Sequence, residues 1–246
     1  MKRLNWQMLL GLSLIALSAL LYLGHYAIFR DAHHIFIYMV GDIAFVPIEV
    51  LLVTLIIHQL LNVREKRAML KKLNMVIGAF FSEVGTQLLK SFYDFDTQAD
   101  SIRQDLIVKK EWSTKDFSRA LKYLKNYDYI VDSKRGDLGD LKKFLIGKRD
   151  FLLGLLENPN LLEHESFTEL LWAVFHLTEE LAFREDTNQL VDTDSEHISG
   201  DMKRAYVLLI SEWLAYMRHL KTDYPYLFSL AIRTNPFDPH ASPEVT

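Results

Sequence analysis

Two long apolar runs fill the first quarter of the chain, and an amphipathic pattern replaces them after residue 62. No residue between Arg3 and Arg30 carries a formal charge, and a second apolar run extends from about residue 35 to 61. A helix of about 20 apolar residues crosses the roughly 30 Å hydrocarbon layer of a membrane. We therefore predict two transmembrane helices, at about 5–29 and 35–61, within a first domain of residues 1–62.

The basic start of the chain, Met-Lys-Arg, also fits a signal peptide. The apolar run that follows is longer than the 7–15 residues typical of such a peptide, and no small-x-small cleavage site closes it. A second apolar run also follows almost at once. We therefore interpret the first run as an uncleaved transmembrane helix.

A short polar connection, residues 30–34 (RDAHH), predicts that the two helices form an antiparallel hairpin. Basic residues at the ends of a membrane segment favour the cytoplasmic side. Lys2 and Arg3 precede the first run, and a basic cluster at residues 64–72 follows the second. We expect an integral protein of the plasma (inner) membrane with both termini in the cytoplasm.

The second apolar run contains two acidic residues and a proline. Asp42 and Glu49 are seven residues apart, or two helical turns, so they project from nearly the same face. Together they would oppose insertion at full depth by about 5–7 kcal/mol, so they need protein, water or an ion as a partner. Pro47 lies between them and predicts a bend or a local opening of the helix.

These acids have two interpretations. In the first, Asp42 and Glu49 line a cation pathway, which requires a homo-oligomer because two helices cannot enclose a pore. In the second, Asp42 lies at the membrane interface, and Glu49 is protonated or hydrogen-bonded to a partner helix.

The apolar positions after residue 62 recur at helical spacing, which predicts an all-α fold: a two-helix transmembrane hairpin followed by a cytoplasmic α-helical bundle. The bundle should occupy residues 63–234, with a flexible tail at 235–246. Ser113 and the sequence S-F-T-E at 166–169 are typical of helix N-termini. The helices that we expect cover about 63–93, 96–111, 113–130, 138–157, 166–184 and 201–222, with a short helix after Pro225 and an acidic connection at 185–200.

Small residues at 78, 82 and 85 form a strip on the first of these helices. Gly78, Ser82 and Gly85 are spaced three and four apart, which allows close approach of another helix. The strip is either a seam between copies of the chain or a site of ordinary packing within one chain.

Composition excludes several classes of site. The chain has no cysteine, so disulfides, thiolate metal sites and thiol nucleophiles are excluded. A net charge of −4 argues against a nucleic-acid partner. No phosphate-binding glycine loop and no hydrolase or metalloprotease motif occurs, so we predict a protein that is not an enzyme and has no cofactor.

Fragments of metal-ligand patterns are present in the predicted bundle. His176 and Glu180 share a helix face, and Glu169 lies seven residues before the histidine. Carboxylate and imidazole at this spacing can ligate a metal, but the paired motifs of a di-metal bundle are incomplete. His164 and His197 could join them in space. An alternation of acids at Asp192, Asp194 and Glu196 starts like a calcium loop, yet His197 and Lys203 replace the required glycine and glutamate.

Two functional hypotheses follow. The first is an oligomeric membrane protein that conducts or senses cations, with the cytoplasmic helices as a regulatory domain and Asp42 and Glu49 as the ion pathway. The second is a membrane-anchored interaction or scaffold domain that recruits a cytoplasmic protein and transports nothing. The lipid bilayer is a partner in both.

Overall fold

The computed structural model describes residues 6–159, 161, 164–187 and 189–244, without the side chains of residues 66–71. Every regular element in this described part is helical, apart from one isolated antiparallel bridge between Asp96 and Val131. The predicted all-α fold is therefore confirmed. The chain divides into two compact units, Met1–Lys66 and Arg67–Thr246, which we call the hairpin unit and the helical unit.

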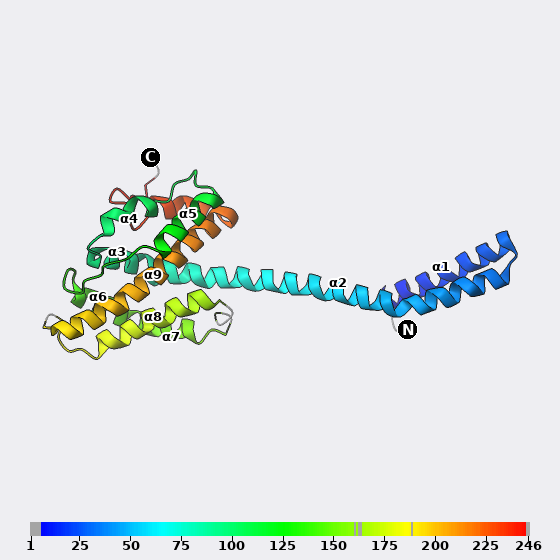
Figure 1. The fold of residues 1–246 in the computed structure, drawn as a ribbon, viewed down its shortest axis with the longest axis horizontal. Helices are drawn as coiled ribbons and strands as arrows, with labels where there is room; N and C mark the ends of the chain where they lie inside the picture. Colours follow the sequence, from blue (N-terminus) through cyan, green and yellow to red (C-terminus); the bar gives the residue numbers. More distant parts are fainter. Residues whose placement is uncertain (1–5, 160, 162–163, 188, 245–246) are drawn as a thin grey trace. The chain divides into compact units, whose positions relative to one another are not determined.

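The hairpin unit contains α1 (Trp6–Phe29) and the first part of α2 (Ala32–Phe80) (Figure 1). Only Arg30 and Asp31 connect them, fewer residues than the sequence suggested. Arg30 adopts a left-handed conformation with φ of 55°, and Asp31 Oδ1 accepts hydrogen bonds from the backbone N–H groups of His33 and His34 at 3.0 and 3.1 Å. The left-handed conformation of Arg30 and the cap formed by the Asp31 carboxylate thus allow the chain to reverse direction between α1 and α2.

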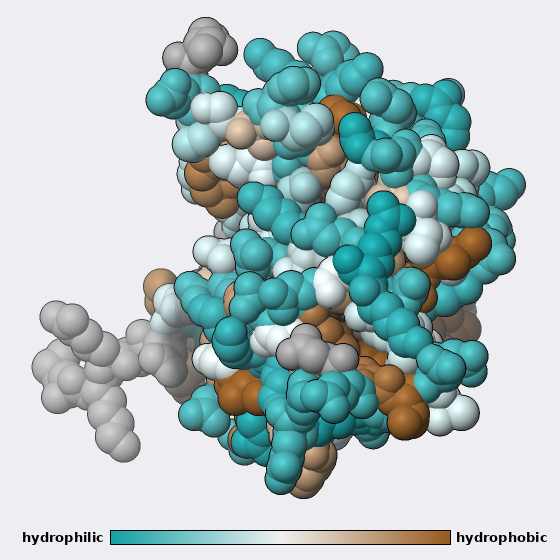
Figure 2. Space-filling model, turned by 90° about the vertical axis from the view of Figure 1, so that its left-hand side faces the viewer, coloured by the Kyte–Doolittle hydropathy of each residue, from teal (hydrophilic) through white to brown (hydrophobic). Residues whose placement is uncertain are grey.

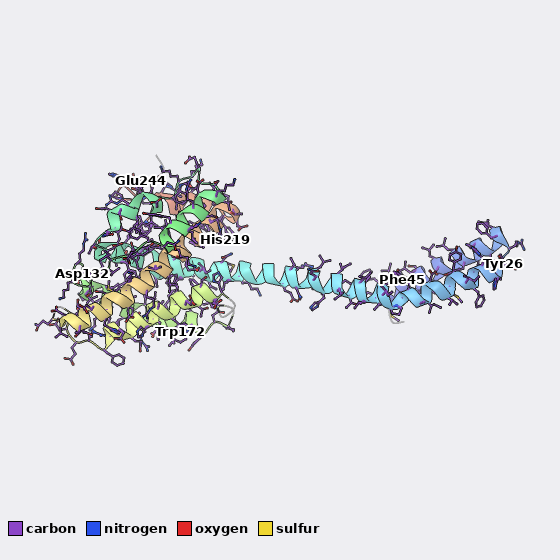
Figure 3. All side chains as sticks on the ribbon, viewed as in Figure 1. Tyr26, Phe45, Asp132, Trp172, His219 and Glu244 are labelled. Carbon is purple, nitrogen blue, oxygen red and sulfur yellow. The ribbon has the colours of Figure 1, made fainter. Side chains whose placement is uncertain are left out.

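The surface of the hairpin unit is largely apolar. Trp6–Phe29 and the Ala32–Glu65 part of α2 are long and apolar enough to cross a membrane, and their most apolar windows are not buried anywhere within the chain. Tyr26 and Phe45, for example, are exposed side chains of these two helices (Figure 3). Pro47 lies inside α2, which continues through it.

Helix α2 continues beyond the apolar segment, as the pattern predicted. Leu73, Ile77 and Phe80 are buried in the helical unit, and the helical path then passes through a π-turn, η1 (Phe81–Gly85), into α3 (Thr86–Phe95). Thr86 Oγ1 donates a hydrogen bond of 2.8 Å to the carbonyl of Phe81, which satisfies an acceptor at the wider turn.

Two of the three small residues on this path make close contacts within the chain. A Cβ on Gly78 would lie 3.2 Å from the hydroxyl of Tyr216, and a Cβ on Gly85 would lie 2.5 Å from a ring carbon of Phe81. Gly85 is buried, whereas Ser82 is exposed. The contacts of Gly78 and Gly85 are thus those of packing inside one chain.

The remaining helices surround α9, the longest helix that lies wholly in the helical unit (Figure 1). Helix α9 packs against α8, α5, α10 and α3, and its buried side chains form the centre of one continuous core. The helices after α3 are α4 (Ala99–Leu106), α5 (Thr114–Lys125), α6 (Leu138–Gly147), α7 (Arg149–Leu156), α8 (Glu165–Ala182), α9 (Asp192–Asp223) and α10 (Pro225–Arg233).

Several predicted boundaries are wrong. The helix expected at 138–157 is two helices that meet at Lys148, and α9 begins at Asp192, nine residues before the predicted start. The N-cap of α8 is His164, whose Nδ1 accepts from the backbone N–H of Phe167 at 3.2 Å, so S-F-T-E is not a capping box. Ser113 and Asp116 form the capping box that starts α5, as predicted.

The packed part of the chain extends into the segment predicted as a tail. Asn235 and Phe237 are buried, and Asn235 Nδ2 donates a hydrogen bond of 2.9 Å to the carbonyl of Leu106. The described residues after Phe237 have exposed or partly exposed side chains.

Figure 2 shows one face of the helical unit, on which hydrophilic side chains predominate and apolar ones form small separate patches.

Candidate metal centre between α8 and α9

Helices α8 and α9 form an antiparallel pair within the helical unit (Figure 1). Their shared apolar positions are fully buried, among them Val174 and Leu177 on α8 and Ile198 and Met202 on α9. This packing fixes the register of the two helices. Polar residues at the border of the buried strip therefore meet at defined positions.

Each helix carries one His-x-x-x-acid pair at this border. His176 and Glu180 lie on α8, and His197 and Asp201 lie on α9. Residues four apart project from the same helix face. Because the helices are antiparallel, each histidine faces the acid of the other helix.

The four side chains form a closed ring of short contacts. Nε2 of His176 lies 3.3 Å from Asp201 Oδ2 and 3.8 Å from Glu180 Oε1. Nε2 of His197 lies 3.4 Å from the same Asp201 oxygen and 3.6 Å from Glu180 Oε2. We call His176, Glu180, His197 and Asp201 the two-helix cluster.

The separations among His176, Glu180 and His197 fit a bound metal ion, and Asp201 Oδ2 lies within 3.4 Å of both imidazoles although it is not part of that mutually close group. One ligand atom from each of His176, Glu180 and His197 lies within 4.8 Å of the other two. Tetrahedral zinc has bonds of about 2.0–2.2 Å, which places its ligand atoms roughly 3.3–3.6 Å apart. Two imidazoles and two carboxylates are a donor set that zinc and similar divalent metals accept.

Asp201 is the buried member of the cluster. Its side chain is only 4% exposed, and Arg204 pairs with Oδ1 at 3.2 Å. Its Oδ2 is buried and accepts no hydrogen bond from any described residue, although two imidazole nitrogens lie within 3.4 Å. A buried acceptor without a partner costs about 1–3 kcal/mol. A cation among the three groups would satisfy it.

Arg184 holds the second carboxylate in place. Its Nη1 lies 2.7 Å from Glu180 Oε2 and also donates to the backbone carbonyl of Glu180, while Nε and Nη2 donate to Asp194 at 2.9 and 2.5 Å. The hydrogen bond from Arg184 lowers the pKa of Glu180 from its ordinary value against the opposing effect of desolvation, and the same guanidinium lowers the pKa of Asp194. Outer partners of this kind orient metal ligands.

The arginine predicts a change in acid stability. Because the pKa values of Glu180 and Asp194 are lowered in the folded protein, their stabilisation is present above the unfolded pKa values and is lost as pH falls through the folded ones. Arg184→Gln removes two ion pairs worth about 0.2–1 kcal/mol each, so it should lower the free energy of unfolding at pH 7 by about 0.5–2 kcal/mol and flatten its dependence below pH 5. Urea unfolding at pH 7 and pH 3, followed by tryptophan fluorescence, measures both.

Arg119→Gln is the matched control, because Arg119 pairs with Asp116 on an exposed surface of α5. It should change the free energy of unfolding by less than about 0.5 kcal/mol at pH 7. Equal losses in the two variants would contradict the role given to Arg184.

The structure brings together some of the residues that the sequence suggested. His176, Glu180 and His197 join in the cluster, whereas Glu169 is exposed on α8 and is not part of it. Asp201 was missed by the sequence analysis. The signal was available, because H-x-x-x-E at 176–180 and H-x-x-x-D at 197–201 repeat the same spacing.

The acids that resemble the start of a calcium loop have other contacts. Asp192 and Asp194 lie in the first turn of α9. Lys134 lies 2.6 Å from Asp192, and Arg184 binds Asp194. Asp192 and Asp194 therefore lie at the start of α9 and form ion pairs with Lys134 and Arg184.

Asp42 and Glu49, the predicted ion-pathway residues, belong to the hairpin unit and not to the two-helix cluster. Asp42 and Glu49 are both exposed on α2, on either side of Pro47. No hydrogen bond or ion pair joins either carboxylate to another residue in the part of the chain that the structure describes.

Comparisons with known proteins cover both units. A family model described as "MJ1433, N-terminal helical domain" matches residues 2–61, and one described as "Uncharacterized protein MJ1433, C-terminal helical domain" matches residues 69–233. The protein named "Uncharacterized protein MJ1433" from Methanocaldococcus jannaschii is 49% identical over 234 residues, which are 95% of this chain and 94% of that protein. No solved structure matches the chain.

Proposed function

This chain belongs to the MJ1433 family, and we propose that it is a membrane-anchored protein whose helical unit binds one divalent metal ion of the zinc class. One observation carries the metal proposal. The buried Oδ2 of Asp201 has no hydrogen-bond partner among the described residues and lies within 3.4 Å of the Nε2 atoms of His176 and His197.

Four protein ligands are typical of a structural or sensing site, because a catalytic zinc keeps one position open for water or substrate. Each helix supplies two ligands, so a bound ion would link α8 to α9. Binding requires neutral imidazoles, and protons therefore compete with the metal. The helical unit would respond to the concentration of free metal and to pH.

A metal titration tests this function. Full-length protein in detergent, stripped with a chelator and dialysed at pH 7.5, should bind one Co²⁺ with the strong visible absorption of a tetrahedral ion. Zn²⁺ should displace the Co²⁺ and raise the melting temperature. Ca²⁺ and Mg²⁺, which prefer six or more oxygen ligands, should do neither. Absence of Co²⁺ absorption together with an unchanged melting curve in Zn²⁺ contradicts the proposal.

The anchor rests on the exposed apolar surface of the hairpin unit. No residue of α1 is buried, and side chains such as Leu9, Ile15 and Leu60 are each more than 60% exposed. A soluble protein rarely exposes so large an apolar surface. Lipid covers it in this proposal, with the helical unit in the cytoplasm. The protein should stay in the membrane fraction after extraction at alkaline pH, and release into the supernatant would contradict the anchor.

Cation conduction is a second candidate function. Its supporting observation is that Asp42 and Glu49 have no partner among the described residues, although a membrane helix must satisfy them. In a homo-oligomer they would form rings of carboxylates that attract cations. Purified protein in liposomes should then pass K⁺ or Na⁺, and Asp42→Asn with Glu49→Gln should reduce the flux severalfold.

Glu65→Gln provides the control for conduction, because Glu65 lies at the end of the apolar part of α2 and outside the pair. Its flux should equal that of the unmodified protein. Equal flux in the Asp42→Asn and Glu49→Gln double variant, or no flux at all, would contradict conduction. The second outcome would favour the alternative prediction, an anchored interaction domain without transport.

A further inference from the structure

Three buried side-chain oxygens gather where α3 ends and have no partner among the described residues. Asp96, Tyr129 and Tyr206 are each at most 1% exposed. The Oδ2 atom of Asp96 and the hydroxyls of both tyrosines are buried and form no hydrogen bond with any residue that the structure describes. Buried polar groups in folded proteins are nearly always hydrogen-bonded, so these three oxygens indicate a further binding partner.

The backbone places Asp96 and Tyr129 on the same side of the chain. Asp96 pairs with Val131 in the isolated antiparallel bridge. Side chains two residues apart along an extended segment point the same way, so Tyr129 lies diagonally across from Asp96 on the face that Val131 shares. Burial follows this alternation, because Tyr129 is buried whereas Ile130 is exposed.

Helix α9, which packs against α3, supplies the third oxygen (Figure 1). The ring of Tyr206 meets the rings of Tyr129 and Phe92 edge to face, with centroids 5.4 and 5.7 Å apart. Phe92 lies one turn before Asp96, whose backbone N–H donates to its carbonyl at 3.1 Å. Burial raises the pKa of both tyrosines, and the charge of nearby Asp96 raises it further, as expected for three groups in one small region.

The hydrogen-bonding capacity of the three oxygens selects the partner. Asp96 Oδ1 accepts from the backbone N–H of Gln98 at 2.9 Å, so Oδ2 is the carboxylate oxygen still to be satisfied. A carboxylate oxygen can only accept, whereas a tyrosine hydroxyl can both donate and accept. One water molecule can therefore donate to Oδ2 and bond to both hydroxyls. Buried waters typically form about three hydrogen bonds of this kind.

The charge of Asp96 does not call for a bound cation. Burial raises the pKa of this carboxyl, while the hydrogen bond from Gln98 and the positive charge of Arg135 lower it. Protein groups thus already oppose the negative charge in part. A neutral partner is sufficient to satisfy Oδ2.

We propose that Asp96 Oδ2 and the hydroxyls of Tyr129 and Tyr206 bind one internal water molecule. The water joins three distant segments at one point: the end of α3, the connection at residues 126–137, and α9. None of the three residues belongs to the two-helix cluster or to the predicted ion pathway, so this inference does not depend on the proposed function.

Removal of one hydroxyl tests the water site. Tyr206→Phe should lower the melting temperature of the full-length protein in detergent by about 2–4 °C, the shift typical of one lost hydrogen bond in a domain of this size. Without a bound water, the variant would only remove an unpaired buried hydroxyl and should be the more stable protein. An equal or higher melting temperature of Tyr206→Phe therefore overturns the proposal.

Tyr226→Phe is the matched control, because Tyr226 is 71% exposed on α10. Its melting temperature should equal that of the unmodified protein. Tyr129→Phe combined with Tyr206→Phe should lower the melting temperature by less than the sum of the two single changes, since both hydroxyls share one water. Additive losses would overturn the shared site.

The occupant is identified directly by a crystal structure of the full-length protein. It should show one ordered water within about 2.7–2.8 Å of Asp96 Oδ2 and within hydrogen-bond distance of both hydroxyls. The melting temperature should be the same in NaCl, KCl and NH₄Cl at equal ionic strength. Direct contact among the three oxygens, or stabilisation by one of these cations alone, overturns the assignment to water.

Discussion

Replacing both histidines of the two-helix cluster by alanine should weaken zinc binding on the order of a thousandfold or more. Loss of an outer partner of a metal ligand typically costs 10–100-fold in affinity, and loss of two direct ligands should cost at least the product of such factors. His176 and His197 come from different helices, so the double variant also removes the link between α8 and α9. Competition with a chromophoric chelator measures the affinity.

The free energy of unfolding measured with zinc should also show the loss of zinc binding in the double-histidine variant. Zinc at 1,000 times its dissociation constant stabilises a folded protein by about 4.1 kcal/mol, and this increment should vanish in the double variant. Without metal, the double variant should be nearly as stable as the unmodified protein, because both imidazoles are about half exposed, at 46% and 51%. Thermal unfolding with and without zinc separates the two effects.

His33→Ala with His240→Ala is the matched control, since it also removes two exposed histidines. Its zinc affinity should be unchanged. A smaller variant, Asp201→Asn, keeps the shape of the buried side chain and should still weaken zinc binding at least tenfold. Equal affinity in the unmodified protein and the double-histidine variant would contradict the cluster as a metal site.

The start of α9 explains why the sequence did not reveal this cluster. Asp192, Asp194 and Glu196 were interpreted as an acidic connection, and His197 was therefore not placed on a helix with Asp201. Acidic residues are favourable in the first turn of a helix, where the backbone N–H groups are unpaired. The same residues were thus evidence for a helix start. Val191 provides no side-chain cap there, so the usual signal of a serine, threonine or aspartate just before the helix was missing.

Long apolar runs and helical periodicity were sufficient to predict the class of fold and the path of α2 into the helical unit. Contacts between distant segments were not predictable from local patterns. Asp96 lies at a suitable place for an N-cap, yet its backbone pairs with Val131 and its side chain caps a turn at Gln98. Glu212 is polar and was not expected in the interior. Its burial results from the packing of distant segments of the helical unit, which no local pattern specifies.

The attachment of α2 to the bundle depends on aromatic packing at Phe80. This side chain is fully buried, and its ring meets the rings of Phe81 and Phe167 edge to face at 5.4 and 5.3 Å. Phe80→Ala should lower the free energy of unfolding of the helical unit by about 3–5 kcal/mol, because it removes a large apolar side chain and leaves a cavity at the joint of α2 with α8. Urea unfolding followed by the fluorescence of buried Trp213 measures this loss.

Phe183→Ala makes the same chemical change at a side chain that is 84% exposed, at the end of α8. It should alter the free energy of unfolding by less than about 0.5 kcal/mol. A similar small effect of Phe80→Ala would mean that α2 is not held by the core of the bundle. A large effect would show that the last turns of α2 belong to the cooperative unit that also contains α8. Metal binding at α8 and α9 would then stabilise the same unit to which the C-terminal part of α2 belongs.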